Sequence, residues 1–249
     1  MMIDLNELVA YCNDLLDCDA FDDYAPNGLQ VEGERRVSCL ATGVSASLEL
    51  IQAAAERGAD ALLVHHGWFW RGEPAPLTGI KGRRVRALMQ HGISLLAYHL
   101  PLDAHAEYGN NVQLARQLDF SSPEPLPGGF LWRGRLAPSC PARVLGRRIA
   151  HCLDREPLHV GHPDDEVHTI AWCTGAAQDA IDQAAAAGVD AYLTGEVSER
   201  TVLAAREMGI HFFAAGHHAT ERYGVQALGA HLEARFDLDV HFIDIPNPA

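Results

Sequence analysis

Short apolar runs alternate with amphipathic segments in the first half of the chain. The runs have the length and flanking glycines of buried strands, and the segments between them have the residue spacing of helices. In chain order the predicted elements are a strand at 39–43, a helix ending at Gly58, a strand at 62–66, a helix at 82–91 ending at Gly92, and a strand at 93–98. This βαβαβ order predicts an α/β fold with a parallel sheet and right-handed crossovers.

The segments around this unit carry weaker signals. Residues 4–17 predict an amphipathic helix, with Asp4 as its N-cap and Glu7 as its capping-box partner. Turn residues between 23 and 33 predict an exposed loop, and a helix is expected near 107–118.

The second half of the chain repeats the pattern. Residues 170–196 correspond in kind to 39–66, and residues 208–221 to 91–103. Chance similarity between two βαβ units is the alternative, but both correspondences occur in the same order, which favours an internal repeat. The repeat predicts two similar α/β lobes with mostly parallel sheets, facing each other across a cleft.

The predicted boundary between the lobes is a segment rich in proline and glycine at 121–130. The N-terminal lobe then spans 1–120 and the C-terminal lobe 131–249, packed together as one globular body. Within the C-terminal lobe we expect a strand just after the connection and a helix at 141–153, with Pro141 in its first turn.

Histidines and carboxylates collect at the predicted strand ends, where open α/β sheets bind ligands. In chain order they are His65, His66, His99, Asp103, His105, Glu196, His217, His218 and Glu221. First-row transition metals accept imidazole nitrogen and carboxylate oxygen together. Because these residues recur at equivalent strand ends, a metal site is favoured over histidines that only cap strands.

Composition limits the classes of function. A net charge of -14 argues against a surface for DNA or RNA duplexes, which need clustered Lys and Arg. The N-terminus lacks the basic start of a signal peptide, and no apolar run approaches a membrane span, so we expect a cytoplasmic protein. The six cysteines form no CxxC pair and are expected to be reduced.

Other catalytic signatures are absent from the sequence. There is no Gly-rich phosphate loop, no GxSxG elbow and no HExxH helix. A metal site at the strand ends is therefore the leading hypothesis for the chemistry.

Six segments carry a family resemblance. They are DYAPNGLQVEG, GADALLVHHG, HLPLDAH, GVDAYLTGE, AGHHATER and IDIPNPA, in this order over almost the whole chain. Together they resemble the Nif-three-like family, often labelled GTP cyclohydrolase I type 2 homologues. The resemblance implies a two-lobed α/β fold, a dinuclear metal centre in the cleft between the lobes, and a ring-shaped homohexamer.

The resemblance also implies a ligand set. The metal ligands carried over by motif are His65, His66, Asp103, His217 and Glu221, with Glu221 as the bridge between the two ions. Many relatives have Pro after the paired histidines where this chain has Gly67, which concerns the loop rather than the ligands. Some relatives carry a large extra domain, for which this chain leaves no room.

The remaining polar and aromatic residues near the strand ends have two interpretations each. His99 and His105 either orient the ligands or are structural. Glu196 is either a proton shuttle or a strand-end carboxylate, and His218, beside a ligand, is left out of the site. The aromatic run at 68–70 either stacks a base or packs in the core or at a subunit interface.

We therefore predict a hydrolase with two divalent transition-metal ions per chain, where Zn, Fe, Mn and Ni are all plausible. Its predicted substrate is a nucleotide or related small molecule, attacked by a metal-activated water. The alternative is a non-catalytic scaffold or metal-handling protein that forms a ring-shaped oligomer. An open coordination position on the metals would distinguish the two.

Overall fold

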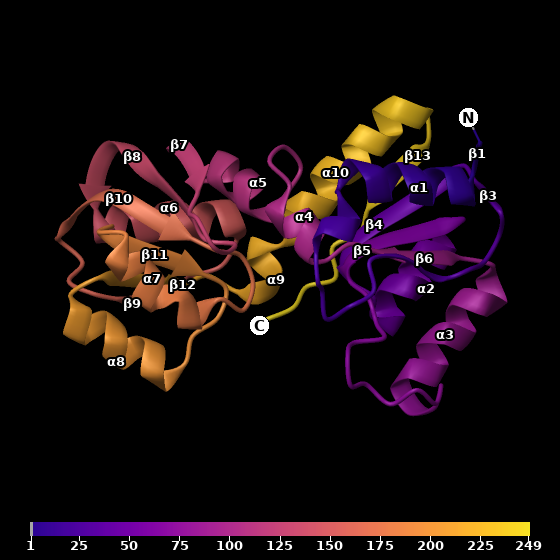
Figure 1. Cartoon of the computed structure of the whole chain (residues 1–249), viewed down its shortest axis with the longest axis horizontal. Helices are drawn as coiled ribbons and strands as arrows, with labels where there is room; N and C mark the ends of the chain where they lie inside the picture. The colour runs from indigo at the N-terminus through magenta and orange to yellow at the C-terminus, as the bar shows by residue number, and fades with distance from the viewer. Residues whose placement is uncertain (1) are drawn as a thin grey trace. The chain divides into compact units, whose positions relative to one another are not determined.

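The computed structural model describes residues 2–249, which form two compact units. Unit 1 contains residues 2–109 and Arg222–Ile245, and unit 2 contains Asn110–Glu221 and Pro246–Ala249. Each unit is an α/β structure built around its own main sheet (Figure 1). The α/β class predicted from the sequence is therefore confirmed.

The main sheet of unit 1 has five strands in the order β13-β4-β5-β6-β2. The strands are β2 (Gly28–Val31), β4 (Cys39–Ser45), β5 (Ala61–His66), β6 (Ser94–Ala97) and β13 (Asp239–Phe242). Neighbours from β13 to β6 are parallel, and β2 is antiparallel to β6. A small antiparallel pair joins β1 (Ile3–Asp4) to β3 (Arg36–Val37).

Two layers of helices cover the sheet of unit 1. The helical segments are α1 (Leu5–Leu15), η1 (Cys18–Ala20), α2 (Leu48–Glu56), α3 (Gly79–His91), α4 (Leu100–Ala104) and α10 (Arg222–Phe236). Helices α1 and α10 cover one face and α2 and α3 cover the other (Figure 1). Because both faces are covered, the central strands are apolar runs rather than alternating ones.

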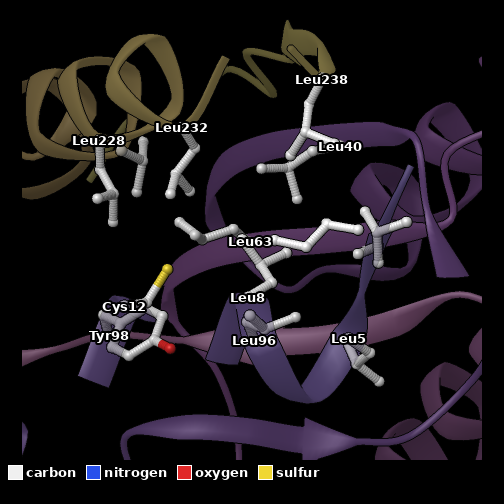
Figure 2. Close-up of a cluster of buried hydrophobic side chains, with 14 of the residues drawn as sticks. Leu5, Leu8, Cys12, Leu40, Leu63, Leu96, Tyr98, Leu228, Leu232 and Leu238 are labelled. Atoms are coloured by element: carbon white, nitrogen blue, oxygen red, sulfur yellow. The ribbon is translucent and has the colours of Figure 1, made fainter. Parts of the chain in front are cut away.

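Side chains of the central strands therefore pack into two apolar cores, one on each face of the sheet. The strand residues packed with α1 and α10 (Figure 2) are Leu40, Ala61, Leu63 and Leu96. Those packed with α2 and α3 are Ala41, Leu62, Val64, Leu95 and Ala97. Alternate side chains of one strand thus stabilise opposite layers, which fixes the register of each strand.

Capping residues mark three helix ends in unit 1. The side chain of Asp4 caps α1 by accepting a hydrogen bond from the backbone N–H of Asn6. Ser47 caps α2 by accepting one from Leu50, and Gly92 ends α3 in the left-handed conformation, with φ of 66°. Glycine is suited to this position because it has no β-carbon to clash.

The main sheet of unit 2 has six strands in the order β7-β8-β10-β11-β12-β9. The strands are β7 (Phe120–Pro125), β8 (Trp132–Pro141), β9 (Leu158–Val160), β10 (Glu166–Trp172), β11 (Ala191–Thr194) and β12 (His211–Ala214). Only β10, β11 and β12 are parallel, so this sheet is mixed rather than mostly parallel.

The helical segments of unit 2 are α5 (Asn110–Gln117), α6 (Ala142–Leu153), η2 (Gln178–Ala180), α7 (Ile181–Ala186), α8 (Glu199–Met208) and α9 (His217–Thr220). Side chains of α7 and α8 share a core with the three parallel strands. Helix α6 contacts β8 and β10, and Pro141 directly precedes it as its N-cap.

The structure divides the chain differently from the predicted boundaries of 1–120 and 131–249. Residues 222–245 return to unit 1, because the apolar side of α10 packs on its sheet and β13 pairs with β4. The predicted connection at 121–130 is also not a linker. Its first half, residues 121–125, belongs to β7, an edge strand, where prolines are tolerated because a missing N–H costs no ladder bond.

Both units contain three consecutive parallel strands joined by helical segments, which is the topology that the internal repeat predicts. Among the described residues, no helix combines the length and apolar character needed to cross a membrane.

The return of α10 to unit 1 predicts that Leu228→Ala destabilises the protein by about 2–5 kcal/mol, because Leu228 is fully buried in the shared core. Denaturant unfolding measures the change. Leu203→Ala in α8 is the matched control, since Leu203 is 50% exposed and its truncation should cost little. Equal effects of the two substitutions would contradict the assignment of α10 to the core.

Candidate metal centre

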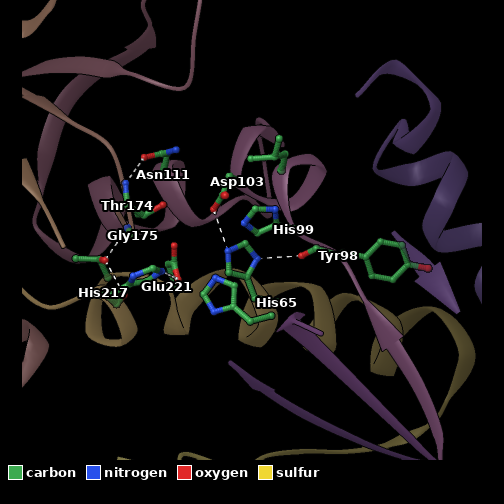
Figure 3. Close-up of polar contacts among 12 residues, drawn as sticks. His65, Tyr98, His99, Asp103, Asn111, Thr174, Gly175, His217 and Glu221 are labelled. Carbon is green, nitrogen blue, oxygen red and sulfur yellow. Dashed lines mark hydrogen bonds and ion pairs between the residues drawn. The ribbon is translucent and has the colours of Figure 1, made fainter. Parts of the chain in front are cut away.

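The first group of candidate ligands lies at the end of β5 in unit 1. His65 is fully buried, and its Nδ1 donates a hydrogen bond of 2.9 Å to the backbone carbonyl of Tyr98 (Figure 3). Its Nε2 lies 3.5 Å from Oδ1 of Asp103. Because a carbonyl only accepts, the bond places the ring proton on Nδ1 and leaves a lone pair on Nε2 for a ligand role.

Two further imidazoles lie beside His65. Ring nitrogens of His65, His66 and His99 all lie within 4.8 Å of one another, which is close enough to hold one metal ion. Nδ1 of His66 lies 3.2 Å from Oγ of Ser45, at the end of the neighbouring strand β4. The structure thus brings the two predicted ligands together with His99.

His99 is held by a carboxylate that the sequence interpretation did not single out. Its Nδ1 lies 2.9 Å from Oδ1 of Asp23, which also accepts hydrogen bonds from Asn27 and the backbone of Leu100. Burial alone would raise the pKa of Asp23, but the bonds from His99 and Asn27 bring it below its ordinary value. The only sequence signal for this carboxylate was its place at the start of DYAPNGLQVEG.

The two other residues predicted after β6 have different roles. Asp103 is buried on α4, one turn beyond His99, and its carboxylate faces His65. His105 instead accepts hydrogen bonds on Nδ1 from the backbone N–H groups of Glu107 and Tyr108. These bonds favour the structural interpretation of His105.

The second group of candidate ligands lies in unit 2, where β12 leads into the short helix α9. His217 begins this helix and Glu221 caps its end, so the two side chains are one turn apart. Nε2 of His217 lies 3.1 Å from Oε2 of Glu221, and Nδ1 lies 2.7 Å from Oε1 of Glu196. Glu196, which follows β11, thus holds His217 by the nitrogen that faces away from Glu221.

The two carboxylates change the titration of His217. Burial alone would lower the pKa of this imidazole, but the hydrogen bonds and negative charges of Glu221 and Glu196 raise it to about 9. A metal ion that binds Nε2 near neutral pH must therefore displace a proton.

Two glycines make room for this pair. A β-carbon on Gly175 would overlap Oε1 of Glu221, and it would lie 3.2 Å from Nε2 of His217. A β-carbon on Gly195 would lie 2.7 Å from Cα of His217. Gly175 also has φ of 69°, in the left-handed region that favours glycine. Gly175 and Gly195, which both lie within the repeated segment 170–196, are thus part of the candidate centre.

The four histidines share one arrangement. In each, Nδ1 faces an oxygen partner, which is Tyr98 for His65, Ser45 for His66, Asp23 for His99 and Glu196 for His217. Histidines that bind metals usually engage their second nitrogen in this way, which orients the ring and fixes its tautomer. The residues therefore fit divalent transition-metal ions, in their donor types and in the support of those donors.

A separate group in unit 1 also has ligand-type atoms. Cys39, Asp239 and His241 offer three donors within 4.8 Å of one another, at the start of the paired strands β4 and β13. Asp239 is mostly exposed and already pairs with His241. This group lacks the oriented imidazoles of the main candidates.

The left-handed glycine predicts a specific effect of Gly175→Ala. The new β-carbon displaces the Glu221 carboxylate, so the pKa of His217 falls from about 9 toward its ordinary value of 6.5. NMR titration of the chelator-treated protein measures this pKa. Gly188→Ala is the matched control, because Gly188 also has φ of 69° but a β-carbon there meets nothing within 4 Å. An unchanged pKa in Gly175→Ala would show that the glycine does not position Glu221.

Comparisons with known proteins agree on one family. The family model described as Duf34/NIF3 (NGG1p interacting factor 3) matches residues 3–248. The chain is 55% identical to a GTP cyclohydrolase 1 type 2 homolog of Allochromatium vinosum, over 100% of this chain and 99% of that protein. It is 50% identical to the Escherichia coli K12 protein of the same name, over 98% of each.

Solved structures give the same result. Protein ybgI, described as of unknown function, has a TM-score of 0.95 and 48% identity, covering 99% of this chain and 100% of that one. TTHA1606 from Thermus thermophilus has a TM-score of 0.92 and 36% identity, with the same coverage. The resemblance predicted from the six sequence segments is confirmed, and the chain belongs to the DUF34/NIF3 family.

Proposed function

We propose that the chain is a metal-dependent hydrolase that holds two divalent transition-metal ions. Its ligands are His65, His66, Asp103, His217 and Glu221, with Glu221 as the bridge. The observation that carries the proposal is the shared arrangement of the histidines, whose Nδ1 atoms face oxygen partners. In His65 and His217 the other nitrogen, Nε2, also faces a carboxylate, which is Asp103 for His65 and Glu221 for His217.

The donor set supports two ions rather than one. The proposed ligands are three imidazoles and two carboxylates, and both carboxylates, Asp103 and Glu221, are buried. Five ligands with one bridging carboxylate would leave coordination positions for water and substrate, since two such ions would accept more donors than the protein provides. Lewis acidity toward water and toward the bond to be hydrolysed is the chemistry that such a centre supplies.

The neighbouring residues of this chain have supporting roles in the proposal. Glu196 orients His217, as its 2.7 Å contact with Nδ1 indicates, and its role as a proton shuttle stays a prediction. The carbonyl of Tyr98 keeps His65 in the tautomer that presents Nε2. The burial of His65 and Glu221 excludes bulk water from the ligands and strengthens their electrostatic interaction with a bound cation.

The proposed substrate is a nucleotide or a related small molecule. The support is the name of the relatives, GTP cyclohydrolase 1 type 2 homologs, since their identity with this chain extends over nearly its full length. The predicted homohexamer and cytoplasmic location stay predictions.

Elemental analysis of freshly purified protein is expected to find about two transition-metal ions per chain. His65→Ala and Glu221→Ala should each remove most of this metal while the protein stays folded by circular dichroism. His168→Ala is the control, because His168 is 64% exposed and lies outside the ligand set.

The variant Cys39→Ser tests whether the separate Cys39 group contributes any of the ions, and no loss is expected. Wild-type protein without metal, or metal that both ligand variants retain in full, would overturn the proposed centre.

Catalysis is tested by a substrate screen over nucleotides, modified nucleotides and small amides, with metal-loaded protein. We expect hydrolysis of at least one class by the wild type and its loss in Glu221→Ala. If both metals prove saturated by protein ligands and no class is hydrolysed, the metal-binding scaffold replaces the hydrolase.

A further inference from the structure

The aromatic run after His66 is divided between the core and the candidate site of unit 1. Trp68 is buried, and its Nε1 donates a 3.0 Å hydrogen bond to the carbonyl of Ala46. Phe69 packs against the same core, with Nζ of Lys81 4.6 Å from its ring centre. Trp70 alone is directed to the candidate ligands, with its ring centre 6.2 Å from that of His66. Core packing therefore explains the first two rings but not the third.

Trp70 stacks with a ring from another loop. Its centre lies 5.5 Å from that of Tyr24, at an interplanar angle of 30°. Both rings meet His99 edge-on, at 5.3 Å for Trp70 and 4.9 Å for Tyr24. We call Tyr24 and Trp70 the aromatic platform. Tyr24 is 52% exposed, so the platform presents a ring surface to solvent beside the candidate ligands.

The platform is held rigidly by its backbone. The N–H of Arg71 donates a 2.7 Å hydrogen bond to the carbonyl of Tyr24, which joins the two loops directly. The side chain of Gln30 accepts a bond from the N–H of Trp68 and donates one to its carbonyl. Gly67 makes this possible, because a β-carbon there would overlap Oε1 of Gln30.

The backbone at Phe69 is strained. Its φ of 65° lies in the left-handed region, which is rare and unfavourable for a bulky residue. The turn changes the direction of the chain between the buried ring of Trp68 and the ring of Trp70, which lies beside His66 and His99. Strain of this kind persists where surrounding contacts impose it, and it clusters at ligand sites.

The polar groups next to the platform are already engaged within the protein. Asp23 binds His99, the backbone of Leu100 and the side chain of Asn27. The other end of the Asn27 amide accepts from the backbone of His99, and Arg71 binds Asp22 and the carbonyl of Asp23. These loops therefore offer a ligand aromatic faces rather than hydrogen-bonding groups of their own.

We propose that the aromatic platform binds the planar heteroaromatic ring of the substrate by stacking, without reading the polar edge of that ring. A purine suits it, because stacking between bases and aromatic side chains tolerates any base and grows with ring area. Placing the ring on the platform puts the rest of a nucleotide beside His66. The link to hydrolysis rests on the proposed function, whereas ring binding itself does not.

Isothermal titration calorimetry with adenosine, guanosine and ribose tests the inference on freshly purified and on chelator-treated protein. Adenosine and guanosine should bind with Kd values within a few-fold of each other, and ribose should bind far more weakly. Trp70→Ala should raise both nucleoside Kd values by about ten-fold or more, and Trp70→Phe should restore most of the affinity.

Two further variants provide a second test of the platform and a control. Tyr24→Ala should weaken nucleoside binding in the same direction, and its exposed ring can be removed without opening the core. Leu77→Ala, at an exposed position farther along the loop that follows Trp70, should change nothing. Equal nucleoside affinity in wild type, Trp70→Ala and Tyr24→Ala would overturn the inference, as would the absence of nucleoside binding to wild type.

Metal content separates this inference from the proposed function. Trp70→Ala should retain the metal of the wild type by elemental analysis. Nucleoside binding that depends on Trp70 in a protein without metal would support the platform and reject the metal centre. If the protein holds two ions per chain and its nucleoside affinity is unchanged by substitution of Trp70 and Tyr24, the platform is rejected and the metal centre is retained.

Discussion

The burial of the central strands of unit 1 is the constraint on which the candidate site depends. Leu62, Leu63 and Val64 are fully enclosed between two helical layers, and His65 continues this strand without becoming exposed. A buried imidazole must find a hydrogen-bond partner. The carbonyl of Tyr98, at the end of the neighbouring strand, provides it. Parallel pairing of β5 and β6 thus decides which nitrogen of His65 carries the proton.

In unit 2 the ligand-type side chains are positioned by close packing against glycines rather than by burial at the end of a strand. His217 and Glu221 lie on one turn of a helix, and their carboxylate and imidazole fit only because Gly175 and Gly195 have no side chain. Glu196 then fixes the outer nitrogen of His217. In both units the ligand-type atoms are thus positioned by contacts that leave little conformational freedom, which is the condition for strong metal binding.

The sequence predicted what depends on local pattern. Apolar runs and helix-ending glycines such as Gly92 identified the parallel strands and helices of unit 1, and polar residues at strand ends identified the candidate ligands. The sequence did not predict the features that depend on long-range packing. Nothing local shows that α10 returns to unit 1, that Asp23 holds His99 from 76 positions away, or that Phe69 turns through the left-handed region. The proline-rich segment 121–130 was predicted to be a linker, but an edge strand begins it. Linkers and edge strands both tolerate proline, so composition alone does not distinguish them.

We propose that two metal ions are held by His65, His66, Asp103, His217 and Glu221. Anomalous X-ray diffraction from crystals of freshly purified protein, at the absorption edge of the metal identified, tests this proposal most directly. We expect two peaks per chain about 3.5–4 Å apart, bridged by the Glu221 carboxylate and contacted by Nε2 of His65 and His217. Peaks at the Cys39 group alone, or no peak beside Glu221, would contradict it.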